Sequence, residues 1–359
     1  MATTQYGVNA NEAVKLWSRD LWVETMKLTT MAPLMGSSKD SALVVKEELQ
    51  KGAGDRVRVT LRMQLGGDGV EGDNTLEGNE EALVTYTDDL LINQLRHAVR
   101  SDGEMTEERI HFSIRNEGKD GLADWWADRI DTALINQLAG NTDQTDTKFT
   151  GHNATLAPTS ATGNTRIIYG DATDTTEASL SSGTDTLSLT YIDRLLNLAK
   201  IATPRIRPAL IGGQRLYCLL VHPNVTRSLV TTNAANIISV FDLQRAEMEG
   251  GKKNSPLLKL MGDAGFQFQY KNVLIKEDSR VPLAPGTTAV YRNVFFGAGA
   301  AMVGFGSRYG NRRMSWKEKL FDYDNQLGIK AGMIWGCKKA QFNSIDNAVI
   351  VQSTFAAAP

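Results

Sequence analysis

The sequence predicts a fold of the α+β class, in which helices and strands both occur without a regular β–α–β alternation. Three observations support this class: two strand-like runs between residues 55 and 99, a long helical pattern over 104–140, and mixed elements from 187 onward. The composition is that of a folded chain, with 42% hydrophobic and 22% charged residues among 359. This length has room for one large domain or two ordinary ones.

Residues 1–50 are expected to form an N-terminal arm. A scattered helical pattern over Ala10–Thr30 carries Trp17 and Trp22, and an irregular stretch follows it. Two tryptophans in an otherwise polar stretch are typical of a segment that docks on another surface. The alternative is an ordinary N-terminal helix on the core of its own chain, and the sequence does not separate the two.

Residues 51–103 are interpreted as a long hairpin. Asp55–Leu65 alternates polar and apolar residues with the period of a strand that has one solvated face, and Leu83–Val99 is a second strand-like run. The glycine-rich tip between them holds no basic residue. An isolated hairpin is only marginally stable in water, so we expect a neighbouring copy of the chain to stabilise it. The tip carries six carboxylates: Asp68, Glu71, Asp73, Glu77, Glu80 and Glu81.

Residues 104–140 are expected to form one long helix. Ser101 and Glu104 have the spacing of a capping box, and Gly140 stands where a C-cap glycine is favoured. At 1.5 Å per residue, a helix of this length would be about 50 Å long. Two interior glycines each lower helix stability by about 1 kcal/mol relative to alanine, so we expect any break to occur there.

The remaining chain divides into three sections. Residues 141–186 are rich in Thr, Ser, Asp, Asn and Gly and are interpreted as a polar surface insertion. A second compact region is expected over 187–309, with a buried strand at Arg215–Val221 and a helix at Ala234–Met248. Alternating and β-branched runs predict strands in residues 310–359.

No set of residues in the sequence points to catalysis, a cofactor or a metal. The four histidines stand apart and form no H-x-x-x-H pair, and no C-x-x-C pair occurs, which argues against a zinc site. A glycine-rich run at 297–304 departs from the dinucleotide-binding fingerprint, and no P-loop is present. Cys218 and Cys337 are expected to be buried thiols in a reducing compartment. We therefore predict a protein that is not an enzyme.

Charge and hydropathy limit the partners. A net charge of −2 gives the whole molecule no electrostatic footprint for nucleic acid or an anionic membrane. Neither a signal peptide nor an apolar run of about 18 residues is present, so we expect synthesis in the cytoplasm.

A basic cluster lies late in the chain and is interleaved with aromatic residues. It consists of Arg308, Arg312, Arg313, Lys317 and Lys319. Such a cluster suits single-stranded nucleic acid, a solvated face or the electrostatic partner of an acidic surface. Our preferred hypothesis pairs it with the acidic hairpin tip.

Several local strings accompany this order of parts. They are Gly54–Val59 and Leu65–Gly69 at the start of the hairpin, Leu76–Leu83 at its return, Trp125–Asp131 in the long helix, and Trp335–Asn343 near the end of the chain. Together they resemble the major capsid proteins of tailed double-stranded DNA bacteriophages, and more closely the podovirus-type coat proteins. The likeness spans nearly the whole chain, except for residues 141–186.

The resemblance implies an architecture. Residues 1–50 would be the N-arm, the hairpin the extended E-loop, and the long helix the spine of the peripheral domain. Residues 187–309 would build mainly the axial domain, and 310–359 would return as strands to the peripheral domain.

The resemblance also implies a function. Copies would assemble into hexamers and pentamers of an icosahedral shell in the host bacterial cytoplasm. The shell would enclose packaged double-stranded DNA without sequence-specific binding. Scaffolding and portal proteins would be partners, and residues 141–186 would either bind a decoration protein or line the exterior.

Two alternatives stay open on the sequence alone. One is an encapsulin-like shell or another virion structural protein of the same fold, and the other is an enzyme with a dispersed site. The inter-subunit contacts that we expect involve the six tip carboxylates, the basic residues Arg308, Arg312 and Arg313, and the tryptophans Trp17 and Trp22.

Overall fold

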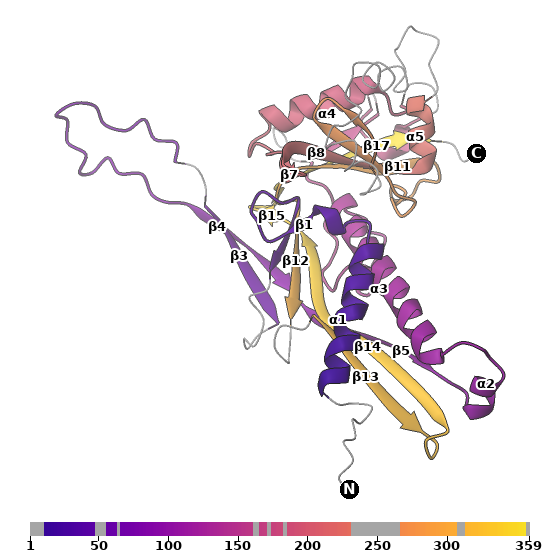
Figure 1. The fold of residues 1–359 in the computed structure, drawn as a ribbon. Coiled ribbons are helices and arrows are strands. Elements are labelled where there is room, and N and C mark those ends of the chain that lie inside the picture. The colour runs from indigo at the N-terminus through magenta and orange to yellow at the C-terminus, as the bar shows by residue number, and fades with distance from the viewer. Residues whose placement is uncertain are drawn as a thin grey trace.

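The computed structural model has two lobes, each built on a β-sheet, and a long hairpin that projects to one side (Figure 1). It describes residues 11–46, 55–62, 65–160, 165–170, 174–181, 185–230, 266–306 and 313–356. Helices and strands mix without regular alternation, which confirms the α+β prediction.

The lower lobe is a six-stranded sheet with helices on one face (Figure 1). The central strand β14 pairs with β13 and then β12 along one edge and with β5 along the other. The strands are β1 (Met35–Gly36), β2 (Leu43–Lys46), β5 (Asn93–Arg100), β12 (Ala301–Gly306), β13 (Met314–Phe321) and β14 (Gln326–Lys339), in the order β1-β2-β12-β14-β13.

The N-terminal helix α1 (Asn11–Leu28) packs on the lower lobe of its own chain. Trp17 stacks on Trp316 with ring centroids 5.7 Å apart, and Trp22 meets Phe305 edge-on at 5.3 Å. In this chain the two tryptophans follow the alternative of an N-terminal helix on its own core, and their docking on another copy stays without support.

The long helical pattern divides into two helices, α2 (Glu104–Glu108) and α3 (Ile114–Ala139). The prediction of one continuous helix is therefore wrong, and the break lies at 109–113 and not at the interior glycines. Gly118 is instead buried where α3 crosses the sheet: an added Cβ there would lie 3.3 Å from Ile329 Cδ1. A small residue at this position therefore serves packing.

Of the two predicted ends of the helix, the C-terminal one is confirmed and the N-terminal one is wrong. Gly140 adopts the left-handed conformation with φ 63° and caps α3, as predicted. The capping box is wrong, because the N-cap of α2 is Gly103 and no side chain caps it. Ser101 Oγ accepts a hydrogen bond from Gly103 N at 3.3 Å, so this serine stabilises the turn before the helix.

The hairpin consists of β3 (Arg56–Arg62) and β4 (Thr85–Leu91), which pair antiparallel along their full length. The second strand-like run splits after Leu91, because β5 leaves the hairpin and joins β14. Asn153 fixes this point: its Oδ1 accepts from Leu91 N at 2.9 Å and its Nδ2 donates to Leu91 O at 3.0 Å. The paired hairpin is thus shorter than the expected 51–103.

The upper lobe is a seven-stranded sheet flanked by helices α4 (Leu189–Ile201) and α5 (Pro223–Val230). The predicted strand at 215–221 is confirmed as β8, whereas the predicted helix Ala234–Met248 lies outside the described residues. The sheet has the order β6-β17-β11-β8-β10-β9, with β7 also paired to β8. Its strands are β6 (Ile167–Tyr169), β7 (Ala209–Ile211), β8 (Gln214–Val221), β9 (Phe266–Tyr270), β10 (Val273–Glu277), β11 (Val290–Phe296) and β17 (Val349–Phe355).

The chain crosses between the lobes more often than the sequence predicts. β12 belongs to the lower sheet although it precedes residue 309, and the C-terminal β17 belongs to the upper sheet. Residues 310–359 therefore do not return as one unit to the lobe that holds α3. The short elements η1 (Ala32–Leu34), η2 (Glu177–Ser179), β15 (Gln341–Phe342) and β16 (Ile345–Asp346) complete the described part of the chain.

Residues 141–186 are more than a surface insertion in their described part. β6 pairs in parallel with β17 inside the upper sheet, and Thr150, Asn153 and Arg166 are buried. The polar composition is misleading because buried polar groups here serve the backbone. Gln137 Nε2, for example, donates to Thr150 O at 2.7 Å.

One hydrophobic core runs through both lobes, and α3 connects them (Figure 1). The C-terminal end of α3 reaches the upper sheet, where the Arg292 guanidinium donates to Gly140 O at 2.6 Å. The same guanidinium is paired with Glu177 at 2.7 and 2.8 Å. A cation at the last helical carbonyls is favourable because the helix dipole is negative there.

Candidate assembly surfaces

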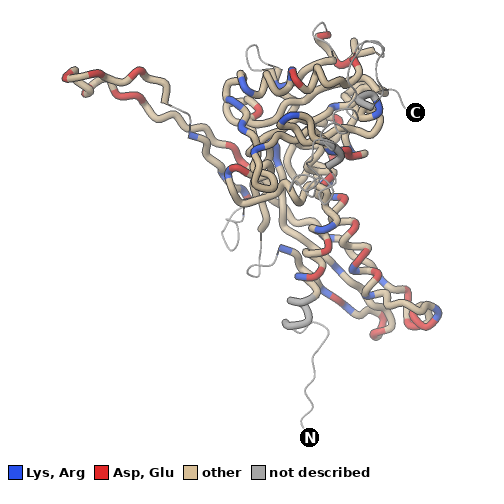
Figure 2. Tube along the Cα trace, turned by 45° about the horizontal axis from the view of Figure 1, so that its top comes forward, with Lys and Arg blue, Asp and Glu red and all other residues tan. Residues whose placement is uncertain are grey.

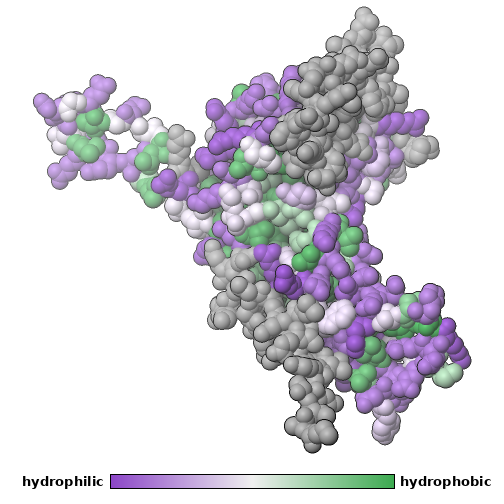
Figure 3. All heavy atoms as spheres, in the orientation of Figure 1, coloured by the Kyte–Doolittle hydropathy of each residue, from purple (hydrophilic) through white to green (hydrophobic). Residues whose placement is uncertain are grey.

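The hairpin tip, residues 65–84, projects away from both lobes (Figure 1). All of its residues are exposed except the half-buried Val70. Leu65, Leu76 and Leu83 are 58–59% exposed, and Figure 3 shows apolar side chains among polar ones on the projecting tip. Exposed leucines on a protrusion of this kind are typical of a surface that another molecule covers.

The tip carboxylates fall into two groups. Glu81 accepts hydrogen bonds from Gly66 N at 2.9 Å and Gly67 N at 2.8 Å, which closes the neck of the tip and lowers the pKa of the Glu81 carboxyl. Glu80 accepts from Gly78 N at 2.8 Å. The other four carboxylates pair with no basic side chain of the described residues, and Figure 2 shows acidic residues along the tip. They are Asp68, Glu71, Asp73 and Glu77.

The root of the hairpin, in contrast, is anchored in its own chain. Val57 and Leu90 pack with Met302, Ala340 and Phe342 in a small buried cluster. The backbones meet closely, because a Cβ on Gly336 would lie 2.0 Å from Leu91 O.

Charged pairs also hold the root in place. Buried Asp88 pairs with Lys338 and accepts a hydrogen bond from Gln341 N at 3.1 Å. On the exposed side, Arg58 and Asp89 form a two-bonded ion pair at 2.8 and 3.0 Å. These contacts therefore fix the direction of the hairpin at its root, while the tip remains exposed.

Of the basic cluster that the sequence predicts, the structure describes Arg313, Lys317 and Lys319. Arg313 lies over the rings of Trp22 and Phe305, at 4.9 and 5.2 Å from their centroids, and burial lowers its pKa. It is therefore packed inside its own chain. Arg308 and Arg312 lie outside the described residues.

Lys317 and Lys319 of the predicted cluster belong to a larger basic surface, whose other members the sequence analysis missed. It lies on the face of the lower sheet that α1 and α3 leave uncovered, and we call it the basic face. Its members are Arg96 and Arg100 of β5, Lys317 and Lys319 of β13, and Lys330 of β14. Only the strand register brings Arg96, Arg100 and Lys330 beside the two lysines, so no local pattern could have found them.

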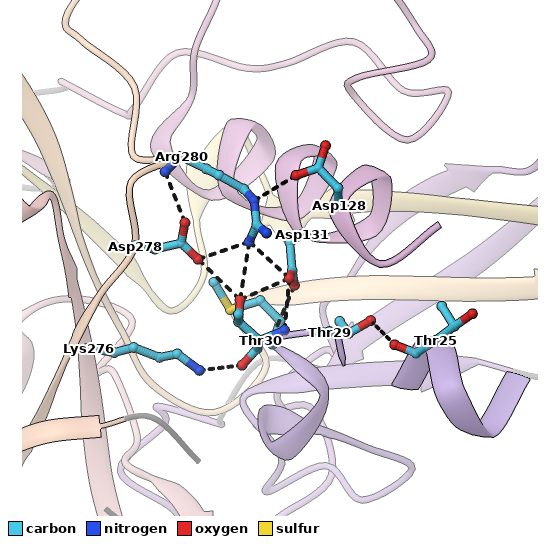
Figure 4. Close-up of polar contacts among 9 residues, drawn as sticks. Thr25, Thr29, Thr30, Asp128, Asp131, Lys276, Asp278 and Arg280 are labelled. Atoms are coloured by element: carbon cyan, nitrogen blue, oxygen red, sulfur yellow. Dashed lines mark hydrogen bonds and ion pairs between the residues drawn. The ribbon is translucent and has the colours of Figure 1, made fainter. Parts of the chain in front are cut away.

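A polar cluster at the junction of the lobes ties three elements together (Figure 4). Asp131 of α3 is fully buried and accepts hydrogen bonds from Thr30 N at 2.8 Å and Met31 N at 3.1 Å, just after α1. Arg280, which follows β10, donates to Asp131 at 3.0 Å. Burial raises the pKa of the Asp131 carboxyl against the opposing effect of these bonds.

The described residues give no sign of a metal, reactive-thiol or membrane-spanning site. No group of three or more His, Cys, Asp or Glu side chains is placed to hold a metal ion within the described ranges. Cys218 and Cys337 are buried free thiols, and burial raises the pKa of both. None of the described helices has the length and hydrophobicity to span a membrane.

Comparisons with known proteins agree with this arrangement. The profile of a family described as phage capsid protein matches residues 5–356. The major capsid protein of Pseudomonas phage KPP25 is 30% identical over 371 aligned positions, which cover 95% of this chain and 93% of that protein.

Solved capsid structures show the same fold. The capsid of Ralstonia phage GP4 matches with a TM-score of 0.77 at 29% identity, covering 100% of this chain and 99% of that one. The capsid of cyanophage Pam1 matches with a TM-score of 0.69 at 18% identity, covering 100% and 95% of the two chains. The α+β fold described above is therefore the fold of tailed-phage capsid proteins.

The chain belongs to the phage capsid protein family. Within that family it is a major capsid protein, the structural subunit of a phage shell. The expectation that the sequence resemblance raised is thus confirmed for both fold and function.

Proposed function

We propose that copies of this chain form the hexamers and pentamers of an icosahedral shell that encloses the double-stranded DNA of a tailed phage. The observation that carries the proposal is the hairpin tip, whose leucines are exposed and four of whose carboxylates pair with no basic side chain of the described residues. The anchored root holds the tip away from the lobes, in reach of a neighbouring copy. Contacts of this kind between obligate partners bury thousands of Å².

The lobes take the roles that this function requires. The lower lobe with α3 is the peripheral domain, the upper lobe is mainly the axial domain, β3–β4 with the tip is the E-loop, and the segment that includes α1 is the N-arm. The chain has a structural role and catalyses no reaction.

Further partners follow from shell formation in the host bacterial cytoplasm. A scaffolding protein and a portal protein act in assembly, and residues 141–186 are the candidate contact for a decoration protein. The near-neutral net charge of −2 suits a wall that holds DNA without sequence-specific binding. An encapsulin-like shell around protein cargo is the alternative, and no observation favours it over a phage capsid.

The first experiment expresses the chain alone and examines it by electron microscopy and sedimentation. Closed shells or capsomer rings support the proposal. If only monomer forms, the chain is expressed again with the scaffolding protein of its phage, and a monomer that persists there contradicts the proposal.

A deletion tests the role of the tip. Removing 66–81 is expected to leave a folded monomer with an unchanged unfolding midpoint that forms no shells. Normal shells from this deletion would contradict the role that we assign to the tip.

A further inference from the structure

The short hairpin β15–β16 lies between the lobes, where the chain passes from β14 of the lower sheet to β17 of the upper sheet (Figure 1). Gln341 pairs with Asp346 across it, and its two turn residues, Asn343 and Ser344, have φ of 50° and 60°. Positive φ at both positions is typical of a type I′ turn, which fixes the register of the two strands. The hairpin therefore brings Asp346 back beside Lys339, the last residue of β14.

Lys339 and Asp346 form a pair that is closed to solvent. Lys339 Nζ lies 3.0 Å from Asp346 Oδ2, and both side chains are 0% exposed. Nζ also donates to Leu156 O at 3.0 Å and to Ala157 O at 3.5 Å. Burial lowers the pKa of Lys339 against the opposing effect of the Asp346 charge. Because burying two charges is costly, transfer of one proton gives a neutral pair in which the two carbonyls hold the amine N–H groups and the nitrogen lone pair faces the carboxyl group.

The surroundings of the Asp346 carboxyl group favour attack by this amine. Thr159 N donates to Oδ2 at 3.2 Å, and Gln341 Nε2 donates to Oδ1 at 3.4 Å. Arg166 is also buried, its charge interacts with that of Asp346, and its Nε and Nη1 have no hydrogen-bond partner. Such donors and a fixed positive charge stabilise the oxyanion that develops when a nucleophile adds to a carboxyl carbon. Groups that a fold holds in reacting positions behave as if their concentration were about 10⁵ M or more.

We propose that Lys339 and Asp346 are joined by an isopeptide bond within the chain. Nζ of the neutral amine adds to Cγ of the protonated carboxyl group, so that the Cγ–Nζ bond forms and the Cγ–Oδ2 bond breaks. The oxygen leaves as water, with one proton from the carboxyl group and one from the amine, and no oxidant or other reactant is needed. The step occurs once per chain and turns over no substrate, so the role of the protein stays structural.

The bond closes a ring over residues 339–346 at the root of the long hairpin. Inside the ring, Ala340 and Phe342 pack with Val57 of β3 and Leu90 of β4. A covalent ring restricts the unfolded chain, as a disulfide does, and so favours the folded arrangement of the root. The inference goes beyond the proposed shell function and does not depend on it, because the bond forms within a single chain.

Peptide mass spectrometry of the purified full-length chain tests the bond. Trypsin cuts after free lysine and not after acylated lysine. The C-terminal tryptic peptide is therefore expected to be 339–359, lighter by one water molecule, in place of 340–359. Chymotrypsin then cuts after Phe342, inside the ring, and the two pieces are expected to stay joined.

Two controls lie on the same strand. Lys338 pairs with Asp88, but its side chain is 17% exposed, so this pair is expected to remain an ion pair and trypsin to cut after Lys338. Lys339→Arg keeps the positive charge without an amine. In that variant trypsin is expected to cut at position 339 and to release 340–359 at its full mass.

The outcomes either support or overturn the inference. Complete release of 340–359 at full mass from the folded, unsubstituted chain overturns it and leaves a buried ion pair. A 340–359 peptide that is lighter by one water also overturns it, because the water then came from a succinimide at Asp346 and Lys339 stayed free. The measurement on the unsubstituted chain needs neither assembly nor a folded variant, so failure of the shell function and failure of this inference give separate results.

Discussion

The acidic residues of the hairpin tip and those of the lobe junction are used in opposite ways. At the junction, Asp131 is fully buried and holds two backbone amides and a guanidinium. At the tip, Asp68 and Glu77 are exposed and pair with no cation among the described residues. Charge that is buried and paired inside a chain belongs to its fold, whereas charge exposed on a projecting tip is available to another molecule. Mutations at the junction should therefore lower the stability of the monomer, whereas mutations at the tip should impair assembly and leave monomer stability unchanged.

The largest effect on folding is expected at the junction. Asp131→Ala should lower the free energy of unfolding by about 3–5 kcal/mol, because Arg280 and two backbone amides lose their buried partner. Urea unfolding of the monomer measures this loss in the free energy of unfolding. Asp128 is the matched control on the same helix: its side chain is 61% exposed, so Asp128→Ala should cost less than about 1 kcal/mol. Equal losses in the two variants would contradict the distinction.

The ionisation of Asp131 should make the free energy of unfolding depend on pH. Its folded pKa is raised above the unfolded value, so the native state holds the proton more tightly. Stability should therefore fall as the pH rises from the unfolded value, about 3.9, through the raised folded value. Asp131→Asn removes this slope, and urea midpoints between pH 4 and 8 compare the two chains. An identical slope in both would show that Asp131 does not cause it.

The second-largest loss of folding stability is expected at the root of the hairpin. Gly336→Ala should lower the free energy of unfolding by about 1–3 kcal/mol, because the new Cβ would lie 2.0 Å from Leu91 O and neither backbone can yield freely. Gly66→Ala is the control at the neck of the tip, where nothing lies within 4 Å of an added Cβ, and it should change little. Similar losses at both sites would mean that the root is no more firmly anchored than the tip.

A smaller effect is expected at the neck of the tip. The amides of Gly66 and Gly67 lower the folded pKa of Glu81, so their contribution is present above the unfolded value and is lost as the pH falls through the lower folded value. In an NMR titration, these two amide signals should shift with a midpoint below about 4.3. Glu81→Gln should abolish the shift, and a midpoint at or above that value would contradict the closed neck.

The smallest effect on folding is expected for the tip itself. Replacing Asp68, Glu71 and Glu77 by their amides should leave the urea midpoint of the monomer unchanged, because these exposed side chains form no ion pair with any other described residue. The same variant should assemble poorly. A clear loss of monomer stability would mean that the tip carboxylates serve the fold after all.

The sequence was sufficient for local features and insufficient for distant pairings. The hairpin, its acidic tip and the C-cap at Gly140 follow from short patterns, and the structure has them. The arm was ambiguous, because only the stacking of Trp17 on Trp316 shows which surface it covers. The Asp131 cluster joins residues that are 100, 101 and 149 positions apart, and the basic face needs β5 beside β14, so both depend on strand register and lobe packing. The polar stretch 141–186 was misjudged, because hydrophilic side chains can also be buried when they satisfy the backbone.

The central claim is that the hairpin tip is ordered by a neighbouring copy and not by its own chain. Hydrogen–deuterium exchange of residues 65–84, measured in the monomer and in assembled shells, tests it most directly. The account predicts rapid exchange of the tip in the monomer and strong protection in the shell, while β3 and β4 near Val57 and Leu90 are protected in both. Equal exchange of the tip in the two states would contradict it.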